Sequence, residues 1–293
     1  MNDQDWLAQQ FEANRRRLRA VAYRMLGSVS EAEDAVQEAW LRLSGSDHEE
    51  IENLAGWLTT VVARVSLNML RSRSVRREEP LTSHLPDPIV DRADSVDPEH
   101  EAMLADSVGL ALLVVLETLT PAERLAFVLH DMFGVPFEEI APLVDRTPQA
   151  ARQLASRARR RVRGQAPTPD PDVHRQREVV DAFFAATRHG DFDALVAVLD
   201  PGVVLRANGG GAPNRPTVVL NGAQTVAGRA VLAQRFAPFA RPALINGTAG
   251  VVAATGNKVF AVMAFTVVGG RIVEIDVLYD PKRVEDLDLS VLD

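Results

Sequence analysis

The clearest periodic pattern in the chain predicts two helices separated by a short break. Residues 137–144 carry apolar side chains on one face of a short helix. A second helix follows, with Thr147 as its N-cap and Pro148 at its first position, where the missing N–H of proline would be unpaired anyway. Small apolar residues then recur at helical spacing and allow the two helices to pack closely: Ala151, Ala155, Ala158 and Val162.

The outward faces of the second helix are strongly basic. Seven arginines and no acid lie between Arg146 and Arg163. A close helix pair with a basic outer face predicts a helix-turn-helix whose second helix enters the major groove of DNA. An ordinary helical hairpin with a solvated basic face is the alternative. The residues expected to meet DNA are Thr147, Gln149, Arg152, Gln153, Ser156, Arg159 and Arg160.

Three further amphipathic helices are predicted earlier in the chain, at residues 5–26, 31–43 and 56–73. In the second of them, a core seam runs beside a stripe of acidic, amide and apolar side chains at the spacing i, i+3, i+4, i+7. A mixed stripe of this kind is what a partner-binding helix needs, although a solvated helix face has the same spacing. The stripe consists of Asp34, Gln37, Glu38 and Leu41.

The helix over residues 56–73 carries a row of polar side chains on one face. Arg64, Asn68 and Arg71 lie about one turn apart along it. Because arginines contact phosphates and asparagine reads base edges, the row predicts a second DNA-binding surface. The arginines that continue this surface are Arg73 and Arg76.

The pattern changes character after a proline-rich linker at residues 165–173. Amphipathic helices are predicted at residues 179–189 and 192–199, and Asp191 is the expected cap of the second one. A further helix is expected at residues 230–239. Because the first two helices precede the strand-like runs and only the third lies between strands, the second half of the chain has an α+β plan.

The predicted strands end in a long hairpin. Gly269 and Gly270 separate the last two runs and favour a tight turn between them. The expected sheet is curved and antiparallel. Its strands are residues 203–207, 217–220, 251–254, 258–268 and 271–279.

Charge is distributed very unevenly along the chain. The formal net charge is −8. Nevertheless, the two basic segments described above flank residues 78–106, which hold nine acids and one arginine. DNA would meet the basic patches rather than the average charge. The prolines in residues 80–98 exclude a helix there and predict a linker.

Composition excludes several classes of site. The chain has no cysteine, which excludes disulfides and zinc–thiolate centres and fits a reducing cytoplasm. Its six histidines show no metal-ligand spacing, so no metal is expected. No apolar run approaches the roughly 20 residues that cross a bilayer, and the polar N-terminus is not a signal peptide. We therefore expect a cytoplasmic protein that does not bind membranes.

Several of these runs together resemble an extracytoplasmic-function (ECF) sigma factor of bacterial RNA polymerase. They are YRMLGSVSEAEDAVQEAWLRL at residues 23–43, the helix that contains Gly-Trp-Leu at residues 56–58, and EIAPLVDRTPQAARQLASRARR at residues 139–160. The resemblance implies two helical domains. Sigma-two binds the polymerase clamp and opens the minus-ten element, and sigma-four binds the polymerase flap and reads the minus-thirty-five element.

The resemblance also implies a role for each candidate surface. The stripe on residues 31–43 becomes the clamp-binding face, and the loop at residues 44–53 captures a flipped minus-ten base. The acidic linker passes through the RNA channel of the polymerase. Its segment HLPDPIV resembles a proline motif of sigma factors that carry an added C-terminal domain. The minus-thirty-five readers become Gln149, Arg152, Gln153 and Ser156.

The C-terminal part resembles a SnoaL-like domain, a cone of sheet around an apolar pocket. The run HGDFDALVAVLDPGVVL at residues 189–205 and the long final hairpin carry this resemblance. It implies a tail that regulates the sigma domains in place of a separate anti-sigma factor. Lys282 and Arg283 are expected to pair with acids of the linker. The expected regulatory contacts are Asn208, Gly209, Gly210, Gly211, Asp280, Pro281, Lys282 and Arg283.

Chemistry in the C-terminal domain would need a buried acid–base group, because SnoaL-like cones host enzymes as well as binding domains. Glu274 and Asp276 are the candidates, since both point to one face of a predicted strand. No nucleophile–base pair is evident, and the glycines of RANGGGAPN lack the lysine and the helix of a phosphate-binding loop. We expect no catalytic residues and no cofactor, and we leave a small ligand in the pocket open.

The predicted fold class is multidomain, with two all-α sigma domains followed by an α+β SnoaL-like cone. The predicted function is promoter-specific initiation with core RNA polymerase and promoter DNA as partners. Two alternatives remain at this point. One is a helix-turn-helix regulator with a ligand-sensing domain, and the other is a SnoaL-type isomerase or hydrolase fused to a DNA-binding domain. The expected segments are sigma-two at 1–77, a linker at 78–104, sigma-four at 105–164, a linker at 165–173, the SnoaL-like domain at 174–285 and a tail at 286–293.

Overall fold

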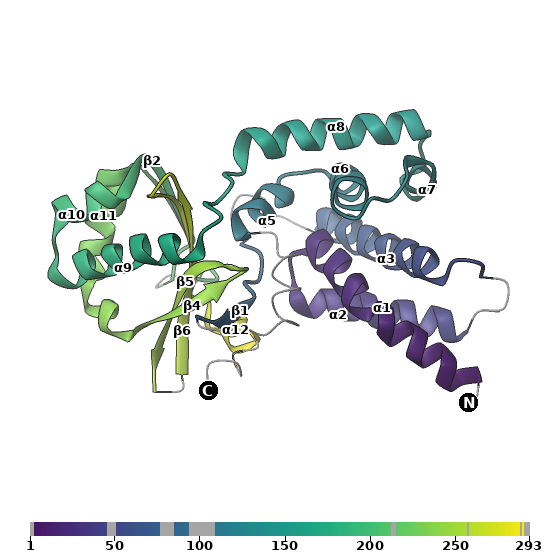
Figure 1. The fold of residues 1–293 in the computed structure, drawn as a ribbon, viewed down its shortest axis with the longest axis horizontal. Coiled ribbons are helices and arrows are strands. Elements are labelled where there is room, and N and C mark those ends of the chain that lie inside the picture. Colours follow the sequence, from purple (N-terminus) through teal and green to yellow (C-terminus); the bar gives the residue numbers. More distant parts are fainter. Residues whose placement is uncertain are drawn as a thin grey trace. The chain divides into compact units, whose positions relative to one another are not determined.

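The computed structural model describes residues 3–45, 51–76, 85–93, 109–211, 215–256, 258–287 and 289 (Figure 1). The chain divides into two compact units. The first contains Met1–Leu81 and Val115–Gln165, and the second contains Thr82–Val114 and Ala166–Asp293. The described part of the predicted linker, residues 85–93, therefore belongs to the same unit as the C-terminal domain.

The first unit begins with three helices, α1 (Asp3–Leu26), α2 (Val29–Ser44) and α3 (Leu54–Arg76). Their packing follows the predicted seams. Ala32, Ala35 and Leu43 of α2 are fully buried. Phe11 of α1 packs against Trp40 of α2 with ring centroids 5.1 Å apart. The three predicted helices are confirmed, and α2 presents its predicted mixed stripe away from this core.

Short helices complete the first unit. After α5 (Leu110–Glu117) come α6 (Pro121–Phe127), the π-helix η3 (Val128–Met132), α7 (Phe137–Ile140), the 3₁₀ turn η4 (Ala141–Leu143) and α8 (Pro148–Gln165). The buried Arg124 donates to Glu117 at 2.7 Å and to the carbonyl oxygen of Arg24 at 3.0 Å. This second bond joins α6 to α1. Apart from residues 110–114 of α5, which belong to the second unit, the helices of the two predicted sigma domains therefore pack together in one unit.

The second unit is built around one seven-stranded sheet in the order β1-β4-β5-β6-β7-β2-β3. The pairing of β2 with β7 is parallel and the other pairs are antiparallel, so the sheet is mixed rather than wholly antiparallel as predicted. The strands are β1 (Val90–Arg92), β2 (Leu199–Asn208), β3 (Val218–Asn221), β4 (Ala240–Ile245), β5 (Thr248–Thr255), β6 (Lys258–Val268) and β7 (Arg271–Leu278).

Helices cover one face of this sheet, and α9 (Val173–His189) contributes most of the aromatic core. Phe183 and Phe184 meet Phe265 of β6 with ring centroids 5.6 and 5.9 Å apart. The remaining helices of the unit are α10 (Phe192–Val198), α11 (Ala223–Leu232), the 3₁₀ helix η5 (Gln234–Phe239) and α12 (Pro281–Glu285). This arrangement confirms the predicted α+β plan.

Several predicted boundaries were wrong. The single helix expected at residues 230–239 is two elements, because α11 ends at Leu232 and η5 contains Pro238. Helix α9 begins six residues earlier than the predicted 179, since Asp172 caps it by accepting from the N–H of His174 at 2.9 Å. Neither β1 nor β4 was predicted, because both runs are short and contain or follow prolines.

The segment before α9 is not a free tether. The carboxylate of Asp170 accepts from the N–H groups of Gly269 and Gly270 at 2.9 and 3.1 Å, which lowers its pKa. The buried Gln176 donates to the carbonyl oxygen of Asp170 and accepts from the N–H of Ala249 at 2.9 Å. The proline-rich stretch is therefore tied to the sheet at the hairpin that the two glycines were correctly predicted to form.

Candidate nucleic-acid and partner interfaces

Helix α8 presents the predicted DNA-reading residues to solvent. Ala151, Ala155 and Ala158 are fully buried, so the opposite faces of the helix point outward. The N–H of Ala150 donates to the Thr147 hydroxyl at 3.3 Å, which confirms the predicted cap. The exposed residues on these faces include Gln149, Arg152, Gln153, Ser156 and Arg160.

Two of the α8 arginines predicted to contact DNA have partners within the first unit. The guanidinium of Arg152 lies over the ring of Phe137, 5.2 Å from its centroid. Arg159 donates to the carboxylate of Asp131 at 2.7 Å. Because Asp131 balances its charge, Arg159 is a weaker candidate for a phosphate contact than the exposed Arg160.

The mixed stripe on α2 is accessible. Asp34, Gln37 and Leu41 are exposed, and 57% of the Leu41 surface is open to solvent. Glu38 is half-buried and accepts from the Nε–H of Arg42, one turn further along, at 3.0 Å. An exposed leucine among carboxylates and an amide is the combination that an amphipathic protein contact needs.

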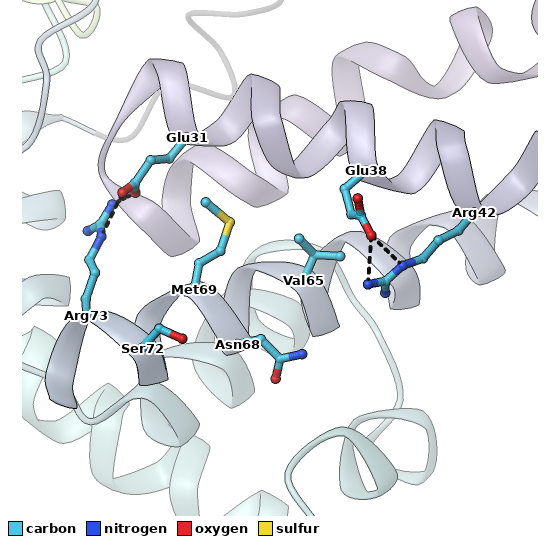
Figure 2. Close-up of a pocket in the computed structure, with 8 residues that line it drawn as sticks. All are labelled: Glu31, Glu38, Arg42, Val65, Asn68, Met69, Ser72 and Arg73. Atoms are coloured by element: carbon cyan, nitrogen blue, oxygen red, sulfur yellow. Dashed lines mark hydrogen bonds and ion pairs between the residues drawn. The ribbon is translucent and has the colours of Figure 1, made fainter. Parts of the chain in front are cut away.

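A groove of about 550 Å³ lies between α2 and α3 and joins the stripe to the row on α3 (Figure 2). Figure 2 shows an ion pair toward each end of it, Glu31 with Arg73 and Glu38 with Arg42. The amide of Asn68 lies between them in this view. The lining residues are Glu31, Glu38, Arg42, Val65, Asn68, Met69, Ser72 and Arg73.

The structure divides the predicted row on α3. Arg64, Asn68 and Arg71 are exposed, as expected for residues that meet a ligand. In contrast, Arg73 donates to Glu31 at 3.0 Å and to the carbonyl oxygen of Leu26 at 2.9 Å, so its guanidinium supports the helix packing. The side chain of Arg76 and residues 46–50 of the loop predicted at 44–53 lie outside the described residues.

The linker forms the edge of the C-terminal sheet through β1. Val90, Asp91 and Arg92 pair with β4, opposite Ile245, Leu244 and Ala243 respectively. The turn after β4 continues the pairing. The N–H of Ile89 donates to the Asn246 side chain at 3.1 Å, and the N–H of Asn246 donates to the carbonyl oxygen of Ile89 at 2.8 Å.

The position of Asn246 depends on an uncommon backbone conformation. Its φ is +49°, in the left-handed region that asparagine tolerates better than most residues. Just before β1, Leu85, Pro86 and Pro88 are buried. The motif that resembled a linker signature is therefore an ordered segment bound to the C-terminal domain.

Helix α12 holds the same segment from its other side. Arg283 donates to the Asp87 carboxylate, with an Nε–Oδ1 distance of 3.2 Å, and to the carbonyl oxygen of Leu85 at 2.6 Å. The predicted pairing of Arg283 with a linker acid is thus confirmed. Lys282 is exposed, and its backbone N–H donates to the capping carboxylate of Asp280 at 3.1 Å. Pro281 occupies the first turn of this helix.

The glycine loop after β2 lies directly beside the start of α12. The N–H of Tyr279 donates to the carbonyl oxygen of Asn208 at 2.8 Å. A Cβ on Gly209 would lie 2.6 Å from the Tyr279 ring, and a Cβ on Gly210, whose φ is +80°, would lie 2.6 Å from the Asp280 carboxylate. Glycine is therefore required at both positions. The two predicted regulatory segments are adjacent in space.

The candidate acid–base residues of the C-terminal domain are held by an arginine. Glu274 and Asp276 lie on one face of β7, as predicted, and both are buried. Arg206 of β2 donates to Glu274 at 2.8 Å and to Asp276 at 3.1 Å. Sequence reasoning missed Arg206, because the parallel pairing of β2 with β7 brings it to these acids across about 70 residues of chain.

The ionisation of this cluster reflects its burial. Burial raises the pKa of Asp276 to about 6, although the charge of Arg206 opposes this change. Burial alone would lower the pKa of Arg206, but its hydrogen bond to Glu274 and the charges of both carboxylates outweigh burial and raise it. One arginine thus faces two buried carboxylates, and Oε2 of Glu274 has no hydrogen-bond partner among the described residues.

Comparison with known proteins covers both units. A family model described as Sigma-70 region 2 matches residues 10–76, and one described as Sigma-70, region 4 matches residues 109–162. The chain is 40% identical to the ECF RNA polymerase sigma factor SigJ of Mycobacterium tuberculosis, over 94% of this chain and 92% of that protein. It is 37% identical to the probable ECF RNA polymerase sigma factor SigI of the same species, over 98% of each chain.

A solved structure shows the same architecture. The crystal structure of Mycobacterium tuberculosis SigJ matches with a TM-score of 0.77 and 35% identity, over 96% of this chain and 99% of that one. The likeness therefore includes the C-terminal α+β domain as well as the helical regions. Among the described residues, no helix has the length and apolarity required to cross a bilayer.

Proposed function

The chain belongs to the family of ECF RNA polymerase sigma factors, and we propose that its C-terminal domain regulates initiation by binding the linker between the two sigma domains. The family membership rests on the identity to SigJ along nearly the whole chain. It makes the chain a transcription factor of the sigma class rather than an operator-binding regulator. The predicted fold class, two helical sigma domains followed by an α+β SnoaL-like domain, is confirmed.

Promoter binding is assigned to the exposed faces of α8 and α3. On α8, Gln149, Arg152, Gln153 and Ser156 read the minus-thirty-five element, and Arg160 contacts phosphates. On α3, Arg64, Asn68 and Arg71 meet the minus-ten region. The support is the exposure of these side chains and the burial of the alanine seam behind the α8 group.

Binding of core RNA polymerase is assigned to the α2 stripe of Asp34, Gln37, Glu38 and Leu41. The exposed Leu41 supplies apolar contact area, and the carboxylates and the amide around it supply hydrogen-bonding groups that fix the orientation of the partner. Reconstituted transcription tests the assignment of function. Core polymerase, a library of promoter fragments and the full chain should give transcripts from discrete start sites, and omission of the chain should remove them. Equal transcripts with and without the chain would contradict the proposal.

The observation that carries the regulatory proposal is the double attachment of the linker. Its backbone completes the sheet edge at β4, and Asp87 is paired with Arg283 of α12. A segment held in this way cannot simultaneously occupy another site, so its release and its binding define two states of the molecule. We assign the control of activity to this exchange, with no separate anti-sigma factor.

A proline at position 89 tests this regulation. Ile89→Pro removes the N–H that donates to Asn246, so β1 should leave the sheet edge. Transcription should then change several-fold, in parallel with faster proteolytic cleavage of the linker. Pro88→Ala leaves the N–H of Ile89 in place and serves as the matched control. Faster cleavage without a change in transcription would overturn the regulatory role but not the family membership.

The C-terminal domain is assigned a binding role without catalysis. The support is that both candidate acids, Glu274 and Asp276, are buried and paired with Arg206, so a catalytic role would require this ion cluster to open. Turnover of a substrate by the full chain that is lost in Asp276→Asn, while transcription is unchanged, would contradict this assignment.

A further inference from the structure

A cluster of phenylalanines is exposed at one end of the sheet of the second unit, where β6 begins and η5 ends. Phe260 of β6 lies 6.1 Å, between ring centroids, from both Phe236 and Phe239 of η5. Phe236 is 45% exposed and Phe239 is 38% exposed. Three phenylalanines placed so close together, two of them open to solvent, form an apolar area that needs a partner.

Positive charge surrounds these rings. Arg235 lies over the Phe236 ring, 4.8 Å from its centroid. Arg241 and Lys258 are exposed on β4 and β6, and Arg241 is steadied by a bond of 3.3 Å to the carbonyl oxygen of Gly256. We call the three rings and these three cations the phenylalanine surface.

Negative charge is absent from the segments that build this surface. No aspartate or glutamate occurs between Asn221 and Val273 of the sequence. At one margin, Gln234 donates to the carbonyl oxygen of Arg188 at 3.2 Å, which places the end of α9 and the start of α10 near it. Asp191 and Asp193 lie there, and Asp191 is engaged in capping α10. The surface therefore suits a ligand that carries negative charge and flat apolar groups.

Two classes of macromolecule have this chemistry, single-stranded nucleic acid and an acidic peptide. An acidic peptide would have to bind as an added strand beside β4. Strand β1 already pairs with residues 243–245, so only the part of β4 before Ala243 is open to such a strand. In that part Pro242 has no N–H to donate to the peptide. Exposed rings interleaved with cations are, in contrast, the usual platform on which unpaired bases stack while their phosphates are neutralised. These features favour the nucleic acid.

We propose that the phenylalanine surface binds single-stranded nucleic acid without sequence preference. Bases stack on Phe236 and Phe239, and Arg235, Arg241 and Lys258 contact the phosphates. The inference goes beyond the proposed function, because promoter recognition is assigned to α3 and α8 and regulation to the linker. The strand could be promoter DNA that has been melted or the nascent transcript, and both present the same bases and phosphates.

Fluorescence anisotropy with labelled oligonucleotides tests the proposal on the full chain, without polymerase. The probes are a 20-nucleotide thymidine strand, a 20-nucleotide uridine strand and a 20-base-pair duplex. Phe236→Ala with Phe239→Ala should weaken binding of the single strands about tenfold or more, since stacking contributes ~1–3 kcal/mol per base. Duplex binding, which is assigned to α8, should be unchanged. A stronger effect on thymidine than on uridine assigns the surface to DNA, and the reverse assigns it to RNA.

Charge variants give a second readout. Arg241→Gln with Lys258→Gln should lower the salt dependence of single-strand binding by a slope of about 1.4, because each lost phosphate contact removes ~0.7. Val219→Ala, which truncates a similarly exposed apolar residue on β3, is the matched control. Circular dichroism verifies that each variant is folded.

Unchanged single-strand affinity in folded variants of both kinds would overturn the proposal. So would binding of an acidic amphipathic peptide that depends on Phe236 and Phe239 while the oligonucleotides show no such dependence. That result would assign the surface to a protein partner. Because these assays contain no polymerase, their outcome is independent of whether the chain initiates transcription.

Discussion

The guanidinium of Arg283 holds the carboxylate of Asp87, 196 residues earlier in the chain, with an Nε–Oδ1 distance of 3.2 Å. Both side chains are largely buried, each 18% exposed. One of them belongs to α12 and the other to the linker that precedes β1. This ion pair therefore fixes the linker to the C-terminal domain at a point separate from the strand pairing.

Reversal of one charge in this pair should loosen the linker. Arg283→Glu and Asp87→Arg should each cost about 1–3 kcal/mol of stability, because each leaves a partly buried charge without its partner. The double variant should recover most of the loss. Thermal unfolding and initiation rates, measured in parallel on the single and double variants, give the coupling between Arg283 and Asp87 in stability and in activity. Lys282→Glu makes the same charge change at an exposed neighbour and should have little effect. Additive losses in the double variant would show that the pair is not coupled.

Shortening Arg152 should weaken promoter binding in a sequence-dependent way. Arg152→Ala should cost about 1–3 kcal/mol on the preferred minus-thirty-five sequence and less on others, if its guanidinium pairs with a guanine. Arg160→Ala on the same helix is the comparison and should weaken all sequences to a similar extent, as phosphate contacts do. Binding measured across a set of promoter variants separates the two. A uniform loss for Arg152→Ala would make it a phosphate contact.

Charge reversal on the α2 stripe should separate the chain from core polymerase. Asp34→Lys with Glu38→Lys replaces one exposed and one half-buried carboxylate, so the fold should persist while the complex is lost. Co-purification with core polymerase and circular dichroism measure the two properties. Glu178→Lys with Asp181→Lys makes the same change of four charges at exposed positions of α9 and controls for total charge. A doubly substituted chain that retains normal polymerase binding would remove this assignment.

Stability of the second unit should depend on pH through Asp276. Its pKa in the folded chain is about 6, above the ordinary value of 3.8, so the folded state binds more protons than the unfolded state between these values. Asp276 therefore adds to the free energy of unfolding below about pH 4, and this stabilisation is lost as the pH rises through about 6. Urea unfolding at several pH values should show this decline in the wild type. Asp276→Asn should remove it, and an identical pH profile in the two proteins would contradict the assignment.

Local signals were sufficient for much of the fold. The Thr147 cap with Pro148 correctly placed the start of α8, and Gly269 with Gly270 correctly placed the last hairpin. The alternation in β7 put Glu274 and Asp276 on one face. Each of these features depends on residues within a few positions of one another, which is the range over which propensity and periodicity act.

The features that the sequence did not predict depend on pairing between segments far apart in the chain. Strand β4 contains Pro242, and β1 is a three-residue strand inside an acidic linker, so neither run has the composition of a strand. Both become strands because each completes the pairing of the other. In the same way, Arg206 joins the two acids only through the parallel pairing of β2 with β7. The roles of the predicted DNA, polymerase and regulatory residues stay predictions, to be decided by the variants above.

The turn that receives the linker also sets an order of events during synthesis. Asn246 follows Ile89 by 157 residues. Because ribosomes add ~5–20 residues per second, roughly 8–30 s pass between the translation of one and the other. Both sigma regions leave the ribosome before the sheet edge exists. Each newly made molecule therefore has an interval of seconds in which its promoter- and polymerase-binding helices are complete but the linker has no strand to pair with.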